Sequence, residues 1–163
     1  TCMYGVNHLS ADTLNGDILL NIDNETMGEF VIGSAGGVNI SASMQYKEVA
    51  PEEGDIAVKV TLKNLRGGHS GLEINQGRAN ANKLMARFVR QAIADDEARL
   101  ASWNGGNMRN AIPRTAQVVL TIPAENLEDL KDLAAYCEGV FASEFYGVEE
   151  SKVYLFHSLN CLT

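Results

Sequence analysis

The sequence lacks long hydrophobic runs and an excess of positive charge, and each absence excludes a class of protein. Its apolar runs are short and broken by charged residues or glycine, whereas a membrane-spanning helix needs about 18 or more apolar residues in a row. We therefore expect no membrane span, and no secretory signal peptide is visible. The formal net charge is −8 at pH 7, so we expect no basic surface for nucleic acid.

Cysteine is also scarce. The three cysteines, Cys2, Cys137 and Cys161, are odd in number and far apart in the sequence. Their spacing fits neither a zinc-ligand pair nor a disulfide framework, so we expect idle or buried thiols. A reducing cytoplasm is the simplest location for such a chain.

The composition that remains is that of one ordinary folded domain. The chain has 163 residues, of which 45% are hydrophobic and 21% charged, enough to bury a core. The pattern changes near residue 35. Before it, the apolar run at 16–23 predicts a strand covered on both faces. After it, alternation over 38–46 predicts a strand with one polar face.

Hydrophobic periodicity predicts a regular order of elements after residue 54. The expected strands cover 56–62, 99–103, 116–122 and 152–159, and the expected helices cover about 79–97 and 127–145. Two split βαβ units of this kind predict an α+β, ferredoxin-like fold, preceded by the extra N-terminal strands. In that fold a four-stranded antiparallel sheet carries both helices on one face.

That fold does not define a function, because unrelated activities use it. An RNA-recognition module would carry aromatic residues on its central strands. The strands at 56–63 and 116–122 contain none, which argues against that class.

One segment contains a histidine that is a candidate functional residue. The run "NLRGGHSGLEINQGRANANKLMARFV" at 64–89 places His69 among glycines, directly after a predicted strand. Glycine lets the backbone adopt positive φ or pass close to another group, and the imidazole can remain exposed. The segment lacks the lysine of a phosphate-binding loop. By itself His69 could be an ordinary surface histidine, and the same interpretation applies to His8 and His157.

Three segments together resemble one family. They are the run at 64–89, "GGNMRNAIPRTA" at 105–116 and "LLNIDNETMGEFVIGSAGG" at 19–37. The first closely resembles the lid domain of aminoacyl-histidine dipeptidases, also called cytosolic non-specific dipeptidases. These belong to the dinuclear-zinc peptidases that include carboxypeptidase G and aminoacylase. The three segments follow the family's order and approximate spacing.

The resemblance implies roles for two residues of the lid. His69 matches a histidine that stabilises the tetrahedral intermediate, a task suited to an imidazole N–H directed at developing negative charge. Asn110 matches a second lid residue, whose amide can bind the backbone or the carboxylate end of the substrate. For Asn110 the alternative is a turn residue that caps the following strand.

The resemblance also implies a metal ligand. Asp23 matches an aspartate that binds one of two zinc ions in the full-length enzyme. Asn24, Thr26 and Met27 differ from the serine and acidic residues usual around it, which puts the surroundings of the ligand in question. The other ligands and the general-base glutamate have no counterpart in this sequence. We therefore expect this chain alone to bind no catalytic zinc and to hydrolyse no peptide.

The implied organisation is an edge strand and crossover of a catalytic domain at 1–36, followed by a lid and dimerisation domain at 37–163. The implied protein is a cytoplasmic homodimer that cleaves unblocked dipeptides, including those with C-terminal histidine. The alternative is a non-catalytic domain that serves only self-association or interaction.

Overall fold

The computed structural model describes residues 4–22, 26–33, 36–149 and 156–159, and the chain divides into two compact units, 1–46 and 47–163. In the first unit the described residues form a short helix, α1 (Tyr4–Asn7), and one 3-10 turn, η1 (Ala11–Thr13). All described side chains of this unit are exposed. No helix in the described part of the chain is long and apolar enough to cross a membrane.

The two predicted N-terminal strands are not formed. The described residues of 16–23 and 38–46 contain no strand, and their apolar side chains are exposed, Ile22 to 95% and Ile40 to 87%. A strand is stable only when neighbours satisfy its backbone hydrogen bonds and a core covers one of its faces. Neither segment has a hydrogen-bonded neighbour strand among the described residues, so the apolar pattern alone does not produce a sheet.

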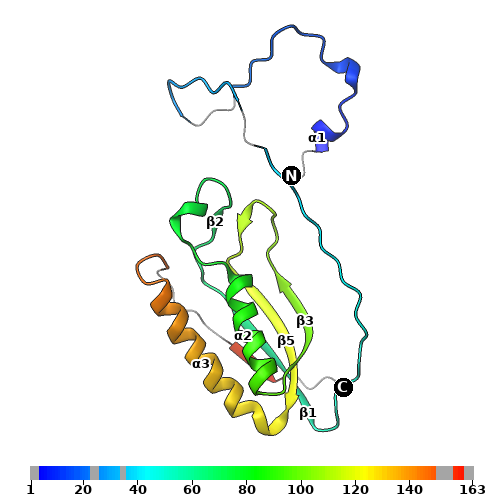
Figure 1. Cartoon of the computed structure of the whole chain (residues 1–163), viewed down its shortest axis with the longest axis vertical. Coiled ribbons are helices and arrows are strands. Elements are labelled where there is room, and N and C mark those ends of the chain that lie inside the picture. The colour runs from blue at the N-terminus through cyan, green and yellow to red at the C-terminus, as the bar shows by residue number, and fades with distance from the viewer. Residues whose placement is uncertain (1–3, 23–25, 34–35, 150–155, 160–163) are drawn as a thin grey trace. The chain divides into compact units, whose positions relative to one another are not determined.

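The second unit is built on an antiparallel sheet (Figure 1). Its strands are β1 (Asp55–Leu62), β3 (Arg99–Gly105), β5 (Ala116–Pro123) and β6 (Phe156–Leu159), in the order β3-β5-β1-β6. Strands β1 and β5 confirm strands predicted from alternation, and β3 confirms the short strand expected at 99–103. Of the fourth predicted strand, 156–159 is extended as expected, while its earlier residues lie outside the described part of the chain.

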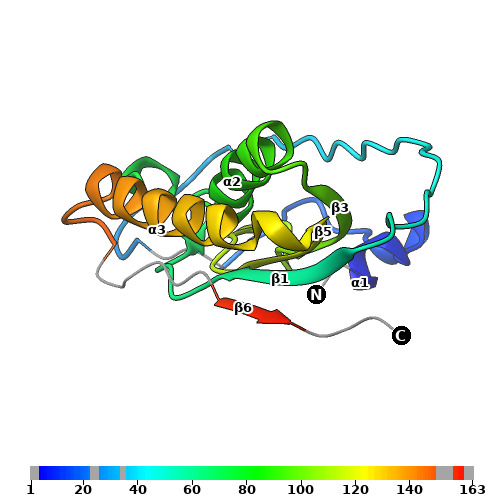
Figure 2. The same cartoon turned by 90° about the horizontal axis from the view of Figure 1, so that it is seen from below.

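Helices α2 (Ala81–Asp95) and α3 (Leu127–Glu144) both cover one face of this sheet (Figure 2). Each confirms a helix predicted from apolar spacing. Asn80 caps the N-terminus of helix α2, and its side chain accepts hydrogen bonds from the backbone N–H groups of Asn82 and Lys83 at 3.0 and 3.2 Å. This cap satisfies two of the N–H groups that the first turn leaves without helical partners.

The core lies between the helices and the two central strands. Alternate residues of β1 and β5 point toward the helices, as period-two strands require, and meet the apolar stripe of α2. Burial of each large side chain contributes roughly 1.5–3 kcal/mol, so this contact holds the sheet and helices together. The largest fully buried side chains are Phe88, Phe141, Leu62, Leu65, Met85, Leu120, Ile122, Val58 and Val118.

Candidate functional site

A second, two-stranded sheet brings two predicted site residues together. Strand β2 (Gly68–His69) pairs antiparallel with β4 (Ala111–Ile112), and His69 lies opposite Ala111. The backbone N–H of Ser70 donates to the carbonyl of Asn110 at 3.0 Å. His69 and Asn110, far apart in the sequence, therefore lie on adjacent segments, and both are exposed. Sequence analysis missed this pairing because two-residue strands are too short to show alternation.

The imidazole of His69 has a fixed hydrogen-bonding pattern. Its Nδ1 accepts hydrogen bonds from the backbone N–H groups of Gly71 and Leu72, at 3.0 and 3.1 Å. A ring nitrogen that accepts carries no proton, so in the neutral ring the proton lies on Nε2. The local backbone thus selects the tautomer in which Nε2–H is a donor.

The backbone on either side of His69 is held by Glu73. One oxygen of Glu73, Oε2, accepts from the backbone N–H of His69 at 2.7 Å, and Oε1 accepts from Arg78 at 2.5 Å. The His69 N–H bond is the main cause that lowers the pKa of Glu73 below its ordinary value, and Arg78 adds to it. Glu73 is therefore an anion at neutral pH, and acid that protonates it would weaken these contacts.

Glu149, which follows α3, holds together the two ends of the segment that contains His69. Its two oxygens accept from the backbone N–H groups of Arg66 and Ala79, at 2.7 and 2.9 Å. Arg66 also donates from its guanidinium to the carbonyl of Val148 at 3.3 Å. The Glu149 carboxylate therefore links the end of the β1–β2 connection to the residues just before α2.

Two glycines are required by this arrangement. Gly67 has φ of +64°, and a Cβ there would meet the Arg114 side chain and the carbonyl oxygen of Ile112, the latter at 3.1 Å. A Cβ on Gly68 would collide with Arg78 and approach Oε2 of Glu73 to 2.7 Å. Glycine at both positions lets the backbone pass close to these groups. The "GG" that precedes His69 thus reflects lack of space as well as backbone conformation.

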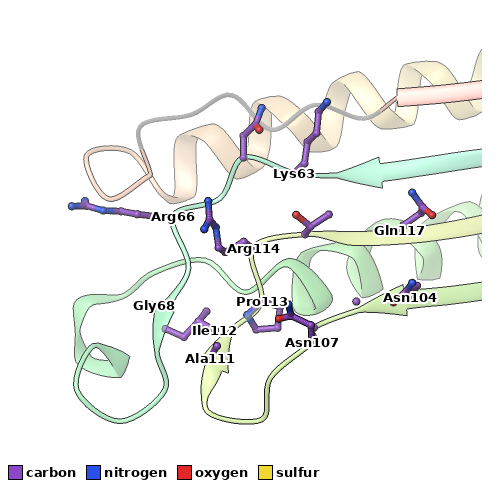
Figure 3. Close-up of a pocket in the computed structure, with 14 residues that line it drawn as sticks. Lys63, Arg66, Gly68, Asn104, Asn107, Ala111, Ile112, Pro113, Arg114 and Gln117 are labelled. Carbon is purple, nitrogen blue, oxygen red and sulfur yellow. The ribbon is translucent and has the colours of Figure 1, made fainter. Parts of the chain in front are cut away.

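A pocket of about 900 Å³ lies beside the β2–β4 pair. In Figure 3 the side chain of Arg114 reaches from the β4–β5 turn toward the β1–β2 connection, whereas Arg66 extends away from the pocket. The charged residues among those that line the pocket, Lys63, Arg66 and Arg114, are all cationic, although the chain has a net negative charge. The lining residues are Lys63, Asn64, Arg66, Gly68, Asn104, Gly105, Gly106, Asn107, Ala111, Ile112, Pro113, Arg114, Thr115 and Gln117.

The predicted metal ligand, Asp23, lies outside the described residues. Among the residues that are described, no group of three or more histidine, cysteine, aspartate or glutamate side chains could hold a metal ion. The described part of the chain therefore offers no complete zinc site.

The other histidines and the cysteines have simpler accounts. His8 donates from Nδ1 to the carbonyl of Tyr4 at 2.7 Å and stacks on its ring, a local contact within α1 and its end. Cys137 is a buried core residue, as one of the two expectations had it, and burial raises the pKa of its thiol. Cys2, Cys161 and the side chain of His157 lie outside the described part of the structure.

Comparisons with known proteins bear on the whole chain. A family model described as the peptidase dimerisation domain matches residues 60–149. The cytosol non-specific dipeptidase of Escherichia coli (strain K12) is 37% identical over 157 residues, which cover 96% of this chain and 32% of that protein. The chain thus spans about a third of the curated relative's length.

Solved structures agree with that match. The crystal structure of aminoacylhistidine dipeptidase from Vibrio alginolyticus superposes with a TM-score of 0.68 at 38% identity. That match covers 72% of this chain and 24% of the other. A putative aminohydrolase from methicillin-resistant Staphylococcus aureus, with a TM-score of 0.50 and 15% identity, covers 66% of this chain and 28% of its own. The latter shows a shared fold alone.

Proposed function

The chain belongs to the peptidase dimerisation domain family, and we propose that it is the lid and dimerisation domain of a zinc-dependent dipeptidase. The full-length enzyme would hydrolyse unblocked dipeptides, including those with C-terminal histidine. The observation that carries this proposal is the β2–β4 pair, which presents His69 and Asn110 side by side on an exposed surface. The similarity to a dipeptidase three times as long supports a catalytic centre in other parts of the protein.

The two lid residues have complementary roles in this proposal. His69, with its proton on Nε2, donates a hydrogen bond to the oxyanion that forms when the peptide carbonyl is attacked. Asn110 orients the substrate through its amide. The cationic lining of the adjacent pocket, with Arg114 reaching toward the β1–β2 connection, favours the carboxylate end of a dipeptide in the same region (Figure 3).

The remaining assignments follow the same proposal. In the full-length enzyme residues 1–36 would form an edge strand and crossover of the catalytic domain, although the described residues of this chain contain no strand there. Asp23 would bind one of two zinc ions, and residues 37–163 would be the lid. The strand order β3-β5-β1-β6 with both helices on one face supports a ferredoxin-like arrangement for the lid. The cytosolic relative supports a cytoplasmic location.

A direct experiment tests the proposed reaction. We expect the full-length protein to hydrolyse unblocked dipeptides, to lose activity when zinc is chelated, and to regain activity when zinc is restored. The 163-residue chain should show neither dipeptide hydrolysis nor a stoichiometric high-affinity zinc site in titration calorimetry, because it offers one proposed ligand. Hydrolysis by the short chain, or a full-length protein indifferent to zinc, would contradict the proposal.

Edge strand β3 is the proposed surface for dimerisation. Among the described residues β3 is paired with β5 alone and lies at the edge of the sheet, where a second chain could pair with it. Leu100 and Trp103 on β3 are exposed to 47% and 37%, and Ile93 on the neighbouring α2 to 49%. A two-fold axis beside β3 would cover this apolar rim in both copies. The same surface also favours the alternative function, self-association without catalysis, and both functions are compatible.

We expect the chain to sediment as a dimer at micromolar concentration, and Leu100→Lys to shift it toward monomer, because the new charge would be buried against its symmetry mate. Tyr136→Lys is the matched control, since Tyr136 is an exposed aromatic residue on α3, 63% exposed and away from β3. Analytical ultracentrifugation of the three proteins measures the effect. A wild-type monomer would refute this interface.

A further inference from the structure

We propose that Glu73 and Arg78 are positioning residues that fix the direction and the tautomer of His69. The kinetic part of this inference rests on the proposed function, in which His69 donates from Nε2. The structural part stands on the contacts of the loop alone. Both residues contact the segment around His69, so in this proposal both act through His69.

Glu73 binds His69 from two sides. Its side-chain Oε2 accepts from the backbone N–H of His69 at 2.7 Å, and its own backbone N–H donates to the carbonyl of His69 at 3.1 Å. The residues enclosed by these two bonds include Gly71 and Leu72, whose N–H groups donate to Nδ1. The bonds that close the loop therefore also direct two donors at the imidazole.

Arg78 also holds this loop, and together Glu73 and Arg78 form what we call the clamp around His69. It donates to Oε1 of Glu73 at 2.5 Å, to the carbonyl of Gly67 at 2.5 Å and to Oε1 of Gln76 at 2.8 Å. The Arg78 guanidinium therefore bridges the carbonyl of Gly67 and the carboxylate of Glu73, and that carboxylate in turn binds the backbone N–H of His69. The absence of a side chain at Gly68 provides the space, since a Cβ there would collide with Arg78.

The partial burial of this pair, greater for Arg78 than for Glu73, makes it sensitive to loss of either partner. The side chain of Arg78 is 11% exposed and that of Glu73 is 32% exposed. Charge-assisted hydrogen bonds of this kind are stronger than neutral ones, and a buried guanidinium without its carboxylate is strongly unfavourable. In contrast, Arg87 and Glu144, which pair between α2 and α3, are 48% and 42% exposed. Such an exposed ion pair contributes little to stability.

Loss of the carboxylate should change the chemistry of His69. Without Glu73 the His69 N–H has no acceptor, the loop relaxes, and the N–H groups of Gly71 and Leu72 no longer converge on Nδ1. Both neutral tautomers then become populated, and Nε2–H loses its fixed direction. Misplacement of a catalytic donor by about 1 Å costs on the order of a hundredfold in rate. The effect should appear in kcat, with KM little changed.

The experiment compares Glu73→Ala, Glu73→Gln and Arg78→Lys with the control Glu144→Ala, which removes a carboxylate from an exposed arginine pair. In the full-length protein we expect kcat to fall by about tenfold to a hundredfold for Glu73→Ala. Glu73→Gln should retain part of the rate, because its amide oxygen can still accept from the His69 N–H. Glu144→Ala should match wild type.

A second readout is independent of activity. Long-range ¹H–¹⁵N spectra of the 163-residue chain report which imidazole nitrogen carries the proton, and we expect a single Nε2–H form of His69 in wild type and mixed tautomers in Glu73→Ala. If Glu73→Ala fails to fold by circular dichroism, Glu73→Gln and Arg78→Lys decide. Wild-type kcat together with a wild-type tautomer signal in these variants would overturn the inference. A His69→Ala enzyme of normal activity would refute the proposed function, and the tautomer spectra would still test the clamp.

Discussion

Replacement of His69 by alanine in the full-length protein is expected to lower dipeptide hydrolysis by about a hundredfold to a thousandfold, the usual effect of losing one well-aimed oxyanion donor. The loss should fall on kcat, because the hydrogen bond forms as charge develops on the carbonyl oxygen. Zinc content should be unchanged, because His69 lies on β2 with Nδ1 bound to backbone N–H groups. Steady-state kinetics and metal analysis of the purified variant measure both quantities.

Two variants control this result. His8→Ala removes another exposed imidazole, one whose described contacts are to Tyr4, and it should retain near wild-type activity. His69→Gln places an amide N–H near the position of Nε2 and should recover part of the rate. Full activity of His69→Ala would show that this histidine is one more surface residue.

The second large effect concerns which subunit His69 serves. We expect a mixture of full-length His69→Ala and Asp23→Ala chains, each inactive alone, to recover activity when the two are unfolded and refolded together. One chain supplies an intact metal site and the other an intact histidine. If His69 acts across the interface, a hybrid dimer has one complete site of two. With random pairing half of the dimers are hybrids, so recovery should reach roughly a quarter of the wild-type activity.

The alternative, in which His69 acts within its own chain, predicts a different result. If His69 serves the active site of its own chain, every site in the mixture lacks either the histidine or the metal ligand, and activity stays at background. Differently tagged chains allow the hybrids to be isolated, so that background activity cannot be attributed to failed pairing. Isolated hybrids without activity would defeat the model in which two chains share one site.

The elements of the second unit follow directly from the sequence. Alternation over 56–62 and 116–122 predicted β1 and β5, and spacings of three and four predicted α2 and α3. These patterns are informative because each element has one face on the core and one toward solvent. Apolar residues therefore recur with the period of the helix or strand. The motif around His69 was visible for a different reason, since close backbone approach demands glycine at 67 and 68.

The sequence was misleading where apolar pattern and tertiary environment disagree. The segments at 16–23 and 38–46 have the composition of strands, yet their described residues are exposed and contain no strand. Local propensity cannot supply the neighbouring strand on which backbone hydrogen bonding depends.

The arrangement of the candidate site was decided by tertiary structure. The pairing of β2 with β4 brings His69 to Asn110, and Glu149 reaches from beyond α3 to close the loop at Arg66 and Ala79. No local pattern encodes such contacts, because they join residues far apart in the chain through single hydrogen bonds. The sequence by itself, through its resemblance to the family, led us to propose His69 and Asn110 as the side chains that carry the chemistry. Only the folded backbone determined that Nδ1 of His69 accepts two N–H groups, which leaves its proton on Nε2, because that choice depends on where the turn after β2 places its donors.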